Sequence, residues 1–519
     1  MYKNNNSRFL KNTIFLYIRM AMTLAMSLYV SRIILDKLGI LDFGIYTTVN
    51  SIVLFVSLFN NALGTGTSRF ITVAVGKESH KLLSETFSTT LTAHIVLAIF
   101  TLLISYLCGS IYLDYYSNIP EYRLSSAKIV FIISLISSLF SLTQAPFLSM
   151  IIAHENMRVF AYISLIDATL KIIICYLLDL VEIDKLVVYS VLYCIVQILI
   201  LSSYRLYCFK CYSEYRFNLK YFNLRLLIKI LKFSFWSLFA SSSIALNNQG
   251  IIFILNSFFS PSVVAARAIS VQINAALNLF IDNIRTAVSP QIVKLYTTNQ
   301  QDKSKDVLLA TTRYCFYFML LITLPVIFLT EILLNIWLID VPPYAVIFTR
   351  LIVVQVLFQV FDSSFYIALY AKGRLVENAL ISPVLGFIQF PILCYLFNEG
   401  YSPIFLSWTN MILYLLLGIV IKPFLLKYVV QYSLSSVYKD LLICACVAIA
   451  SIIIPLIFNL TFDVNSIQNI LLFLFICITS TILSIWFIGL KKVEKEKIFF
   501  LAKKLKFTTN KHNRSLSQS

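Results

Sequence analysis

Charged side chains are scarce in this 519-residue sequence, where Asp, Glu, Lys and Arg together make up only 13% of the residues. Soluble domains carry a charge at roughly a quarter of their positions, so this composition excludes a soluble globular protein. The long apolar runs also lack the alternation of polar and apolar residues that a membrane β-barrel strand requires. What remains is a protein built from membrane-spanning helices.

The sequence also lacks the residue groupings that many enzymes and pumps use. The four histidines are scattered at 80, 94, 154 and 512, and no phosphate-binding loop of the P-loop type occurs. Cys208 and Cys211 form a lone CxxC pair in a basic segment, without a second pair or a nearby histidine. We therefore expect no catalytic residues, no resident metal and no cofactor, and we do not expect ATP-driven transport by this chain alone.

Apolar residues dominate instead, at 59% of the chain, in runs that recur from one end to the other. A helix of about 20 residues crosses the ~30 Å hydrocarbon layer. On this basis the sequence predicts an all-α polytopic bundle with about fourteen crossings, at 11–35, 44–73, 84–110, 126–152, 159–180, 186–208, 226–256, 264–294, 306–338, 345–370, 376–398, 402–426, 439–459 and 468–490.

Basic residues gather in alternate connecting segments, for example at 205–225, 303–305, 372–374 and 491–514. The positive-inside rule then predicts that both termini are cytoplasmic, in an inner (cytoplasmic) membrane. The net charge of +18 would suggest nucleic acid in a soluble protein, but here the cations flank membrane helices. We expect membrane lipids as neighbours and no nucleic-acid partner.

A weak internal repeat suggests how the crossings are grouped. Shifting the sequence by 221 residues aligns 44–73 with 265–294 without a gap, with six of thirty positions identical. An even number of crossings per half predicts two six-helix lobes related by a pseudo-two-fold axis along the membrane normal. The expected domains are an N-terminal lobe at 1–208, a basic linker at 209–225, a C-terminal lobe at 226–426, two added crossings at 439–490 and a basic tail at 491–519.

A specific family resemblance appears in the first 80 residues. It is carried by Asn12-Thr13, Leu16-Tyr17-Ile18-Arg19-Met20, Leu28-Tyr29-Val30-Ser31-Arg32, Leu38-Gly39, Asp42-Phe43-Gly44-Ile45-Tyr46, Ser68-Arg69-Phe70 and Gly76-Lys77. This pattern resembles bacterial polysaccharide-unit flippases of the Wzx type, from the superfamily that also contains MATE-type drug exporters and lipid II flippases. The resemblance implies a two-lobed bundle with alternating access and a cargo of undecaprenyl-pyrophosphate-linked oligosaccharide. It also implies coupling to a proton or Na⁺ gradient, with a polysaccharide polymerase and a chain-length regulator as partners.

Charged residues inside the predicted crossings are the candidate site residues, because a charge at mid-bilayer costs about 2.5–3.5 kcal/mol on insertion scales. The candidate cations are Arg19, Arg69, Lys171, Arg285 and Arg313, and the candidate counter-ions or coupling acids are Asp167, Asp282 and Asp362. Guanidinium groups suit a pyrophosphate because they bind phosphate oxygens bidentately. The excess of cations favours an anionic cargo.

Each candidate also has a structural interpretation. Lys171 lies four residues after Asp167 and Arg285 lies three residues after Asp282, spacings at which a local ion pair forms on a helix. Arg69 lies near the end of its crossing and could serve as an anchor. Arg19 and Arg313 have no acidic neighbour in sequence and are therefore the strongest candidates, unless an acid on another helix, such as Asp362, pairs with them.

Gly64 and Gly66 are two of only twelve glycines in the chain and lie close together in one crossing. A hinge for lobe motion is one interpretation, and close helix packing or a bend is the other.

The sequence thus predicts a flippase that moves lipid-linked oligosaccharides to the periplasmic leaflet for surface polysaccharide such as O-antigen, capsule or exopolysaccharide. A cation-coupled drug exporter of the same superfamily is the nearest alternative, although such a site should favour buried acids. A membrane-embedded polysaccharide polymerase or acyltransferase is a third alternative. It should carry a large outer loop or clustered acid/base residues, which this sequence lacks.

Overall fold

The computed structural model describes residues 2–77, 79–154, 156–212, 217–245, 249–372, 376–462 and 466–496. Within these ranges, the side chains of 2–19, 21, 54–59, 61, 157, 236–245, 287 and 376–380 are outside the description. The side chain of the predicted site residue Arg19, and most of the predicted basic tail, therefore lie outside the described residues.

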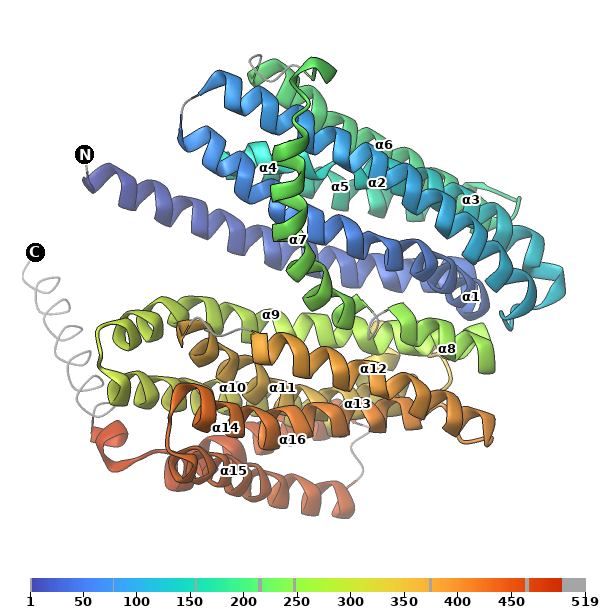
Figure 1. Cartoon of the computed structure of the whole chain (residues 1–519). Helices are drawn as coiled ribbons and strands as arrows, with labels where there is room; N and C mark the ends of the chain where they lie inside the picture. Colours follow the sequence, from blue (N-terminus) through green and yellow to red (C-terminus); the bar gives the residue numbers. More distant parts are fainter. Residues whose placement is uncertain are drawn as a thin grey trace, which may run out of the picture. The chain divides into compact units, whose positions relative to one another are not determined.

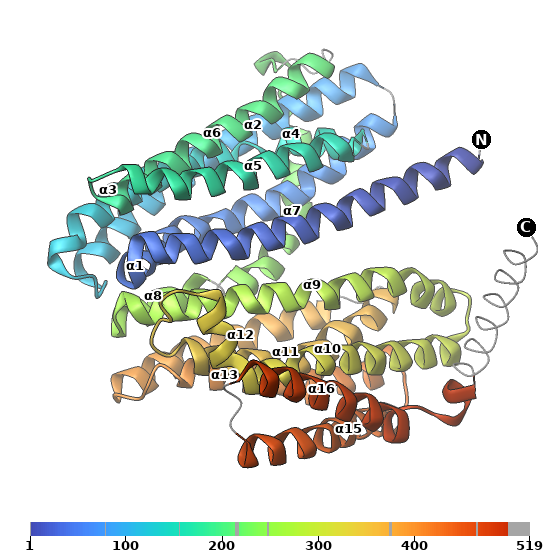
Figure 2. The same ribbon diagram turned by 180° about the vertical axis from the view of Figure 1, so that it is seen from behind.

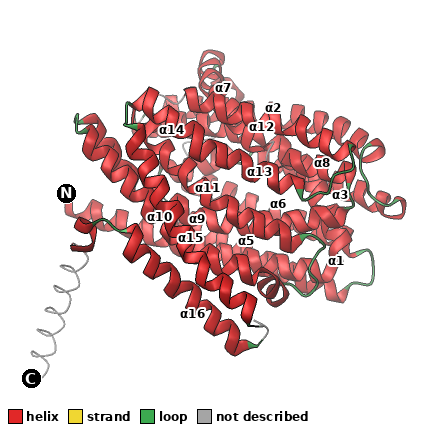
Figure 3. Cartoon of the chain, turned by 90° about the horizontal axis from the view of Figure 1, so that it is seen from below, coloured by secondary structure: helices red, strands yellow, loops and turns green. Residues whose placement is uncertain are grey.

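The regular structure in the described ranges is helical throughout (Figure 3). The helices are α1 (Tyr2–Gly76), α2 (His80–Tyr115), α3 (Glu121–Leu142), α4 (Ala145–Ala153), α5 (Met157–Leu177), α6 (Lys185–Cys211), α7 (Leu224–Ala245), α8 (Ile251–Phe258), α9 (Pro261–Thr297), α10 (Gln301–Trp337), α11 (Ala345–Lys372), α12 (Val376–Asn398), α13 (Phe405–Leu415), α14 (Lys422–Leu425), α15 (Leu434–Thr461) and α16 (Ile467–Ser484). Short 3₁₀ turns occupy η1 (Leu178–Leu180) and η2 (Leu219–Tyr221), and π-helical segments occupy η4 (Leu416–Ile421), η5 (Leu426–Val430) and η6 (Ile485–Gly489).

Eleven helical segments within the described residues are long and apolar enough to cross a membrane. They match eleven of the predicted crossings, which confirms the prediction of an all-α polytopic membrane protein. The other predicted crossings, 11–35, 44–73 and 226–256, fall on α1, α7 and α8, ranges that include undescribed side chains. Cys208 and Cys211 belong to the end of α6 rather than to a loop, and Cys208 is buried there.

The chain divides into two compact units (Figures 1 and 2). Unit 1 contains residues 1–276, 332–349 and 376–410, and unit 2 contains residues 277–331, 350–375 and 411–519. Unit 1 includes α7, because α7 packs on α1 through contacts such as that of Ser234 with Gly66. The two six-helix lobes and their pseudo-two-fold axis remain a prediction.

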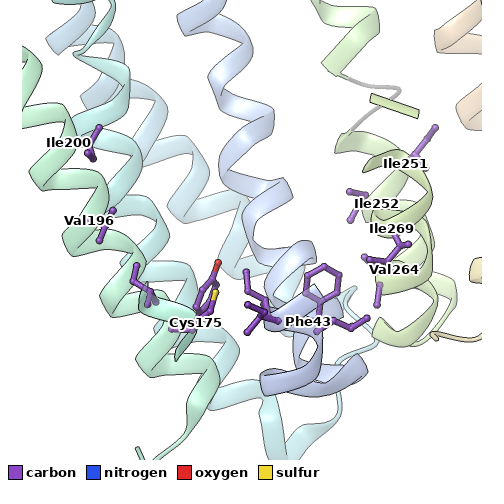
Figure 4. Packing of buried hydrophobic residues seen from close by; sticks show 14 of the residues in the cluster. Phe43, Cys175, Val196, Ile200, Ile251, Ile252, Val264 and Ile269 are labelled. Atoms are coloured by element: carbon purple, nitrogen blue, oxygen red, sulfur yellow. The ribbon is translucent and has the colours of Figure 1, made fainter. Parts of the chain in front are cut away.

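The core of unit 1 joins helices that are distant in sequence. Phe43 of α1, Cys175 of α5, Val196 and Ile200 of α6, Ile251 and Ile252 of α8, and Val264 and Ile269 of α9 belong to one buried cluster (Figure 4). Lipid tails are as apolar as these side chains, so in a bilayer the cluster is held by close packing rather than by exclusion of water. This packing fixes the helices that carry the candidate site.

The segment around Gly39 shows what part of the family-like motif does. Gly39 has φ 78° and ψ 167°, a conformation open to glycine, and it divides α1 into two helical arms. Three residues later, Asp42 pairs with Arg123 of α3, whose guanidinium also binds Asp184 at 3.0 Å just before α6. The motif thus ties the bend in α1 to the starts of two other helices.

The pKa of Asp184 reflects this ion-pair network. Burial opposes ionisation of its carboxyl group, but hydrogen bonds from Ser126 (2.6 Å) and Arg123 hold its pKa below the ordinary value. Because the folded-state pKa of Asp184 is lowered, this carboxylate stabilises the protein above the ordinary pKa of aspartate, whereas burial raises the pKa of Asp42 in the same network. That contribution is lost only as the pH falls through the folded-state pKa.

Gly44, in the same motif, allows the backbone of α9 to come very close. A Cβ at this position would overlap the carbonyl oxygen of Pro261, a backbone atom that cannot rotate away. We therefore predict that Gly44→Ala lowers stability by about 2 kcal/mol or more, as overpacking does. Gly76→Ala is the matched control, because a Cβ there meets nothing within 4 Å. Thermal unfolding in detergent measures both, and equal melting temperatures for the two variants would contradict the prediction.

Candidate functional site

The crossing at 121–153 is broken about two thirds of the way along its length. α3 ends at Leu142, and α4 begins at Ala145 with Pro146 in its first turn. Proline suits that position because its missing N–H would have had no intrahelical partner. A break at membrane depth leaves carbonyl groups that still need hydrogen-bond donors, since no bulk water is present there.

Two side chains from neighbouring helices supply those donors. The Nη2 of Arg205 on α6 donates to the Phe140 carbonyl at 2.9 Å. The Nδ1 of His94 on α2 lies 3.0 Å from the Leu142 carbonyl, which can only accept, so Nδ1 carries the proton. In the neutral ring Nε2 is then an acceptor, and it receives the hydroxyl of Thr67 on α1 at 3.1 Å. The break is therefore a built feature rather than a local defect.

A cavity of about 830 Å³ lies beside this break, a size within the range of small-molecule sites. One wall comes from α1, where Thr65, Ser68, Arg69 and Thr72 recur at helical spacing. The other wall comes from the end of α3 and the start of α4, with Ser141, Gln144, Ala145, Leu148, Ser149 and Ile152. The described lining is completed by Asn60, Gly64 and Val73.

A second cavity, of about 340 Å³, shares Ser141 with the first. Two serine pairs line it from one face of α3, because Ser134 and Ser138, and likewise Ser137 and Ser141, are four residues apart; we call these four residues the serine stripe. Asn50 of α1 and Ser190, Tyr193 and Gln197 of α6 face the same space, with Tyr46. We call the hydroxyl and amide residues of the two cavities the polar seam.

Two buried polar atoms next to the polar seam lack hydrogen-bond partners among the described residues. They are Nε2 of Gln144, a side chain that is only 7% exposed, and Oδ1 of Asn60. A buried unpaired group costs roughly 1–3 kcal/mol, which a bound ligand with matching groups would recover. Both residues line the larger cavity.

Arg69 is the charged residue in the described linings of the two cavities. Its guanidinium stacks over Phe233 of α7 with 4.4 Å between Cζ and the ring centroid. No carboxylate in the described part of the chain forms an ion pair with it. Of the predicted cations whose side chains are described, Arg69 is the one without a carboxylate partner, so its guanidinium can bind an anionic ligand.

The other predicted cations whose side chains are described, Lys171, Arg285 and Arg313, have carboxylate partners. Lys171 pairs with Asp167 at 2.7 Å, and Arg285 pairs with Asp282 at 3.1 Å. Both are the local ion pairs that their spacing in the sequence suggested. Lys171 also lies 5.3 Å from the ring centroid of Tyr193, at the edge of the polar seam.

Arg313 is 2% exposed and binds two acids of unit 2, Asp440 on α15 at 3.3 Å and Glu494 at 2.6 Å. Asp362 pairs with Lys422, a buried lysine that sequence reasoning did not single out, at 3.1 Å. Because these partners are far apart in sequence, no local spacing reveals the pairs. Sequence reasoning also missed Gln144 and the serine stripe of α3. The helical spacing of these four serines within an apolar run could have predicted a polar helix face.

The two glycines proposed as a hinge have different surroundings. Gly66 packs against α7, where a Cβ would overlap the hydroxyl of Ser234 and lie 3.3 Å from the Cγ2 of Ile230. Gly64 is open enough for a Cβ to lie at an ordinary 3.6 Å from that of Ala145. The contacts support close packing for Gly66, and the hinge remains a prediction.

Comparison with known proteins adds the fold family. The MatE family matches residues 16–177. The structure is similar to the lipid II flippase MurJ in an inward closed conformation, with a TM-score of 0.72 and 15% identity over 91% of this chain and 98% of that one. It is also similar to an inward-facing multidrug resistance MATE transporter, with a TM-score of 0.68 and 14% identity over 81% and 99% of the two chains.

A third similar structure is a MOP superfamily transporter from Pyrococcus furiosus, with a TM-score of 0.56 and 13% identity over 80% of this chain and 93% of that one. No curated protein matches the sequence. The identities are low, so the likeness establishes the fold that these membrane transporters share, and the cargo of each belongs to that protein.

The contacts of Arg313 predict a large stability effect. Arg313→Ala removes the buried partner of Asp440 and leaves it only the half-exposed Lys491 at 3.5 Å, so we expect a loss of about 3 kcal/mol. Lys305→Ala is the control on the same helix, because its partner Asp302 is 94% exposed and the pair contributes little. Thermal unfolding, together with the glycan export that the sequence predicts, measured per molecule, separates a structural role of Arg313 from a cargo-binding one. An Arg313→Ala protein with unchanged melting temperature and lost export would instead make Arg313 a cargo-binding residue.

The contacts of Gly66 predict a rescue. Gly66→Ala should lower the melting temperature through the overlap with Ser234, whereas Gly64→Ala should not. Ser234→Ala removes a buried hydroxyl that has no described partner, so it should be nearly neutral alone and should restore the Gly66→Ala protein. Melting temperatures of the single and double variants test this. Loss of transport in both glycine variants, without rescue, would favour the hinge.

Proposed function

We propose that this chain is a flippase that moves polyprenyl-pyrophosphate-linked oligosaccharides across the cytoplasmic membrane for surface polysaccharide synthesis. The observation that carries the proposal is the lining of the two cavities, which combines many hydroxyl and amide groups with the guanidinium of Arg69. Sugars are recognised through dense neutral hydrogen bonding, and a pyrophosphate needs a cation. The polar seam offers the neutral hydrogen-bonding groups, and Arg69 offers the cation, within unit 1.

Aromatic rings at one end of the polar seam support the same cargo. Tyr46 and Tyr193 line the smaller cavity, and their ring centroids are 6.4 Å apart at an interplanar angle of 76°. Phenol side chains present an apolar face together with a hydroxyl, a combination that suits the mixed surface of a sugar ring. The serine stripe of α3 continues from these rings toward Arg69.

The same lining argues against a drug exporter for organic cations. A buried organic cation needs a carboxylate to replace its counter-ion. The described residues of both cavities include no Asp or Glu, and Asp167 next to them is already paired with Lys171. The fold shared with MurJ and MATE transporters is compatible with either cargo, and the lining supports the anionic one.

Alternating access fits this cargo without covalent chemistry. The charged head and the sugars would travel in the cavity while the polyprenyl tail stays in lipid, and both termini would remain cytoplasmic. A proton or Na⁺ gradient as the driving force, and a polymerase and chain-length regulator as partners, belong to the same proposal. Under it, Arg69 binds the cargo, while Lys171, Arg285 and Arg313 serve mainly in ion pairs.

Deletion of the gene tests the function directly. We predict that lipid-linked repeat units accumulate on the cytoplasmic face and can be recovered by lipid extraction. We also predict that surface glycan is lost, as measured by glycan staining. Within that strain, Ser138→Leu should fail to restore export, because leucine fills the polar seam. Ser125→Leu should restore it, since Ser125 is exposed on the same helix and lines neither cavity. Unaltered export in the deletion strain, with no second flippase present, would reject the proposal.

A further inference from the structure

We propose that the start of α4, together with Gln144 and Arg69, forms a phosphate-binding subsite that holds the pyrophosphate of the cargo. The inference rests on the proposed function for the identity of the cargo. It goes beyond that function by assigning the pyrophosphate to the break between α3 and α4. The sugars would then bind along the serine stripe of α3.

The break supplies the first element of the subsite. α4 is nine residues long, and the first N–H groups of any helix have no intrahelical acceptor and carry the positive end of the helix dipole. Pro146 contributes no N–H, so the donors of this turn come from Ala145 and Phe147. Ala145, Leu148 and Ser149 line the larger cavity, which places this helix start on its wall. Discontinuous helices of this kind bind anionic groups in other transporter folds.

Gln144 supplies the second and independent element. It immediately precedes α4, is 7% exposed and lines the larger cavity. Its Oε1 accepts from the Nε of Arg205 at 3.4 Å, which orients the amide so that Nε2 is the remaining donor. That Nε2 has no hydrogen-bond partner in the described part of the chain. A phosphate oxygen at the helix start would give this buried donor its acceptor.

Arg69 supplies the third element. It lines the same cavity from α1, one face of which also presents Thr65, Ser68 and Thr72. Gly64 on this arm allows α1 to lie against the start of α4, since a Cβ there would be 3.6 Å from that of Ala145. Stacking on Phe233 restrains the guanidinium while its N–H groups remain available for a bidentate contact with phosphate oxygens.

The electrostatic balance of this region favours an anion. The helix start, Arg69 and the nearby Arg205 contribute positive potential, and the described lining contains no carboxylate. Phosphate in this setting has two sources, the pyrophosphate of a polyprenyl-linked substrate or the head group of an anionic phospholipid. Both share the same anionic oxygens, so a binding experiment must separate them.

The experiment uses the full-length protein in detergent and measures Kd for defined probes. Gln144→Glu is the informative variant, because glutamate keeps the acceptor for Arg205 and the side-chain volume but replaces the free donor with a negative charge. We expect wild-type protein to bind undecaprenyl pyrophosphate, and Gln144→Glu to weaken that binding at least tenfold with an unchanged melting temperature. Undecaprenol, which lacks phosphate, should bind both proteins equally.

Ser125→Glu is the charge-matched control. It adds the same charge on the exposed face of α3, lines neither cavity, and lies nineteen residues, roughly 28 Å, from Gln144 along the crossing. At that separation the charge is largely screened, so binding of undecaprenyl pyrophosphate should change less than about twofold. Arg69→Gln should weaken binding, and Arg69→Lys should restore part of it.

Each outcome has a definite meaning. Equal binding of undecaprenyl pyrophosphate by wild type and Gln144→Glu overturns the subsite, whatever the deletion strain shows. Equal weakening by Gln144→Glu and Ser125→Glu also overturns it, because the effect would then be one of net charge. If phosphatidylglycerol or inorganic pyrophosphate competes as well as undecaprenyl pyrophosphate, and Gln144→Glu abolishes that competition, the phosphate subsite stands and the proposed cargo falls.

Discussion

A membrane-spanning helix cannot leave backbone polar groups without partners, and the break at Thr143–Gln144 makes this constraint visible. α3 and α4 together form one crossing, so the carbonyls freed by the break need donors from other helices. Arg205 and His94 provide them, which forces α2, α6 and the second arm of α1 to meet at this level. The same break opens the wall of the larger cavity. The position of the candidate site therefore follows from a backbone requirement rather than from a cluster of charges.

Charges inside the bundle follow a related rule. A buried ion without a partner is expensive, so most of the intramembrane charges in the described residues are paired. The buried pairs of unit 2, Arg313 with Asp440 and Glu494, and Lys422 with Asp362, hold α10, α11, α14 and α15 to one another. These charged groups therefore stabilise the fold through ion pairs and are not available to bind a ligand. Arg69, in contrast, rests on an aromatic ring and keeps its hydrogen-bonding groups for another partner.

The predictability of these features depends on the distance along the chain between interacting residues. Helical crossings and the pairs Asp167–Lys171 and Asp282–Arg285 follow from local patterns, so the sequence alone predicts them. The partners of Arg313 could not be predicted in this way, because they lie on helices whose packing depends on the entire bundle. The motif around Gly39 was identified as a family feature, and only the structure explains it through the Asp42–Arg123 pair and the approach of Pro261 to Gly44.

The sparse charge of the cavity has a consequence for transport. A carrier must release its cargo on the far side of the membrane. A site that binds the cargo with equally high affinity in both conformational states slows that release. One guanidinium and one helix start hold a pyrophosphate less tightly than a ring of arginines would, because each added charge-assisted contact deepens the bound state. The neutral serine stripe adds many weak contacts, each nearly balanced by the loss of water. Under the proposed function, such a lining would distinguish cargo from ordinary lipid through the number and placement of hydrogen bonds while leaving the total affinity modest, as turnover requires.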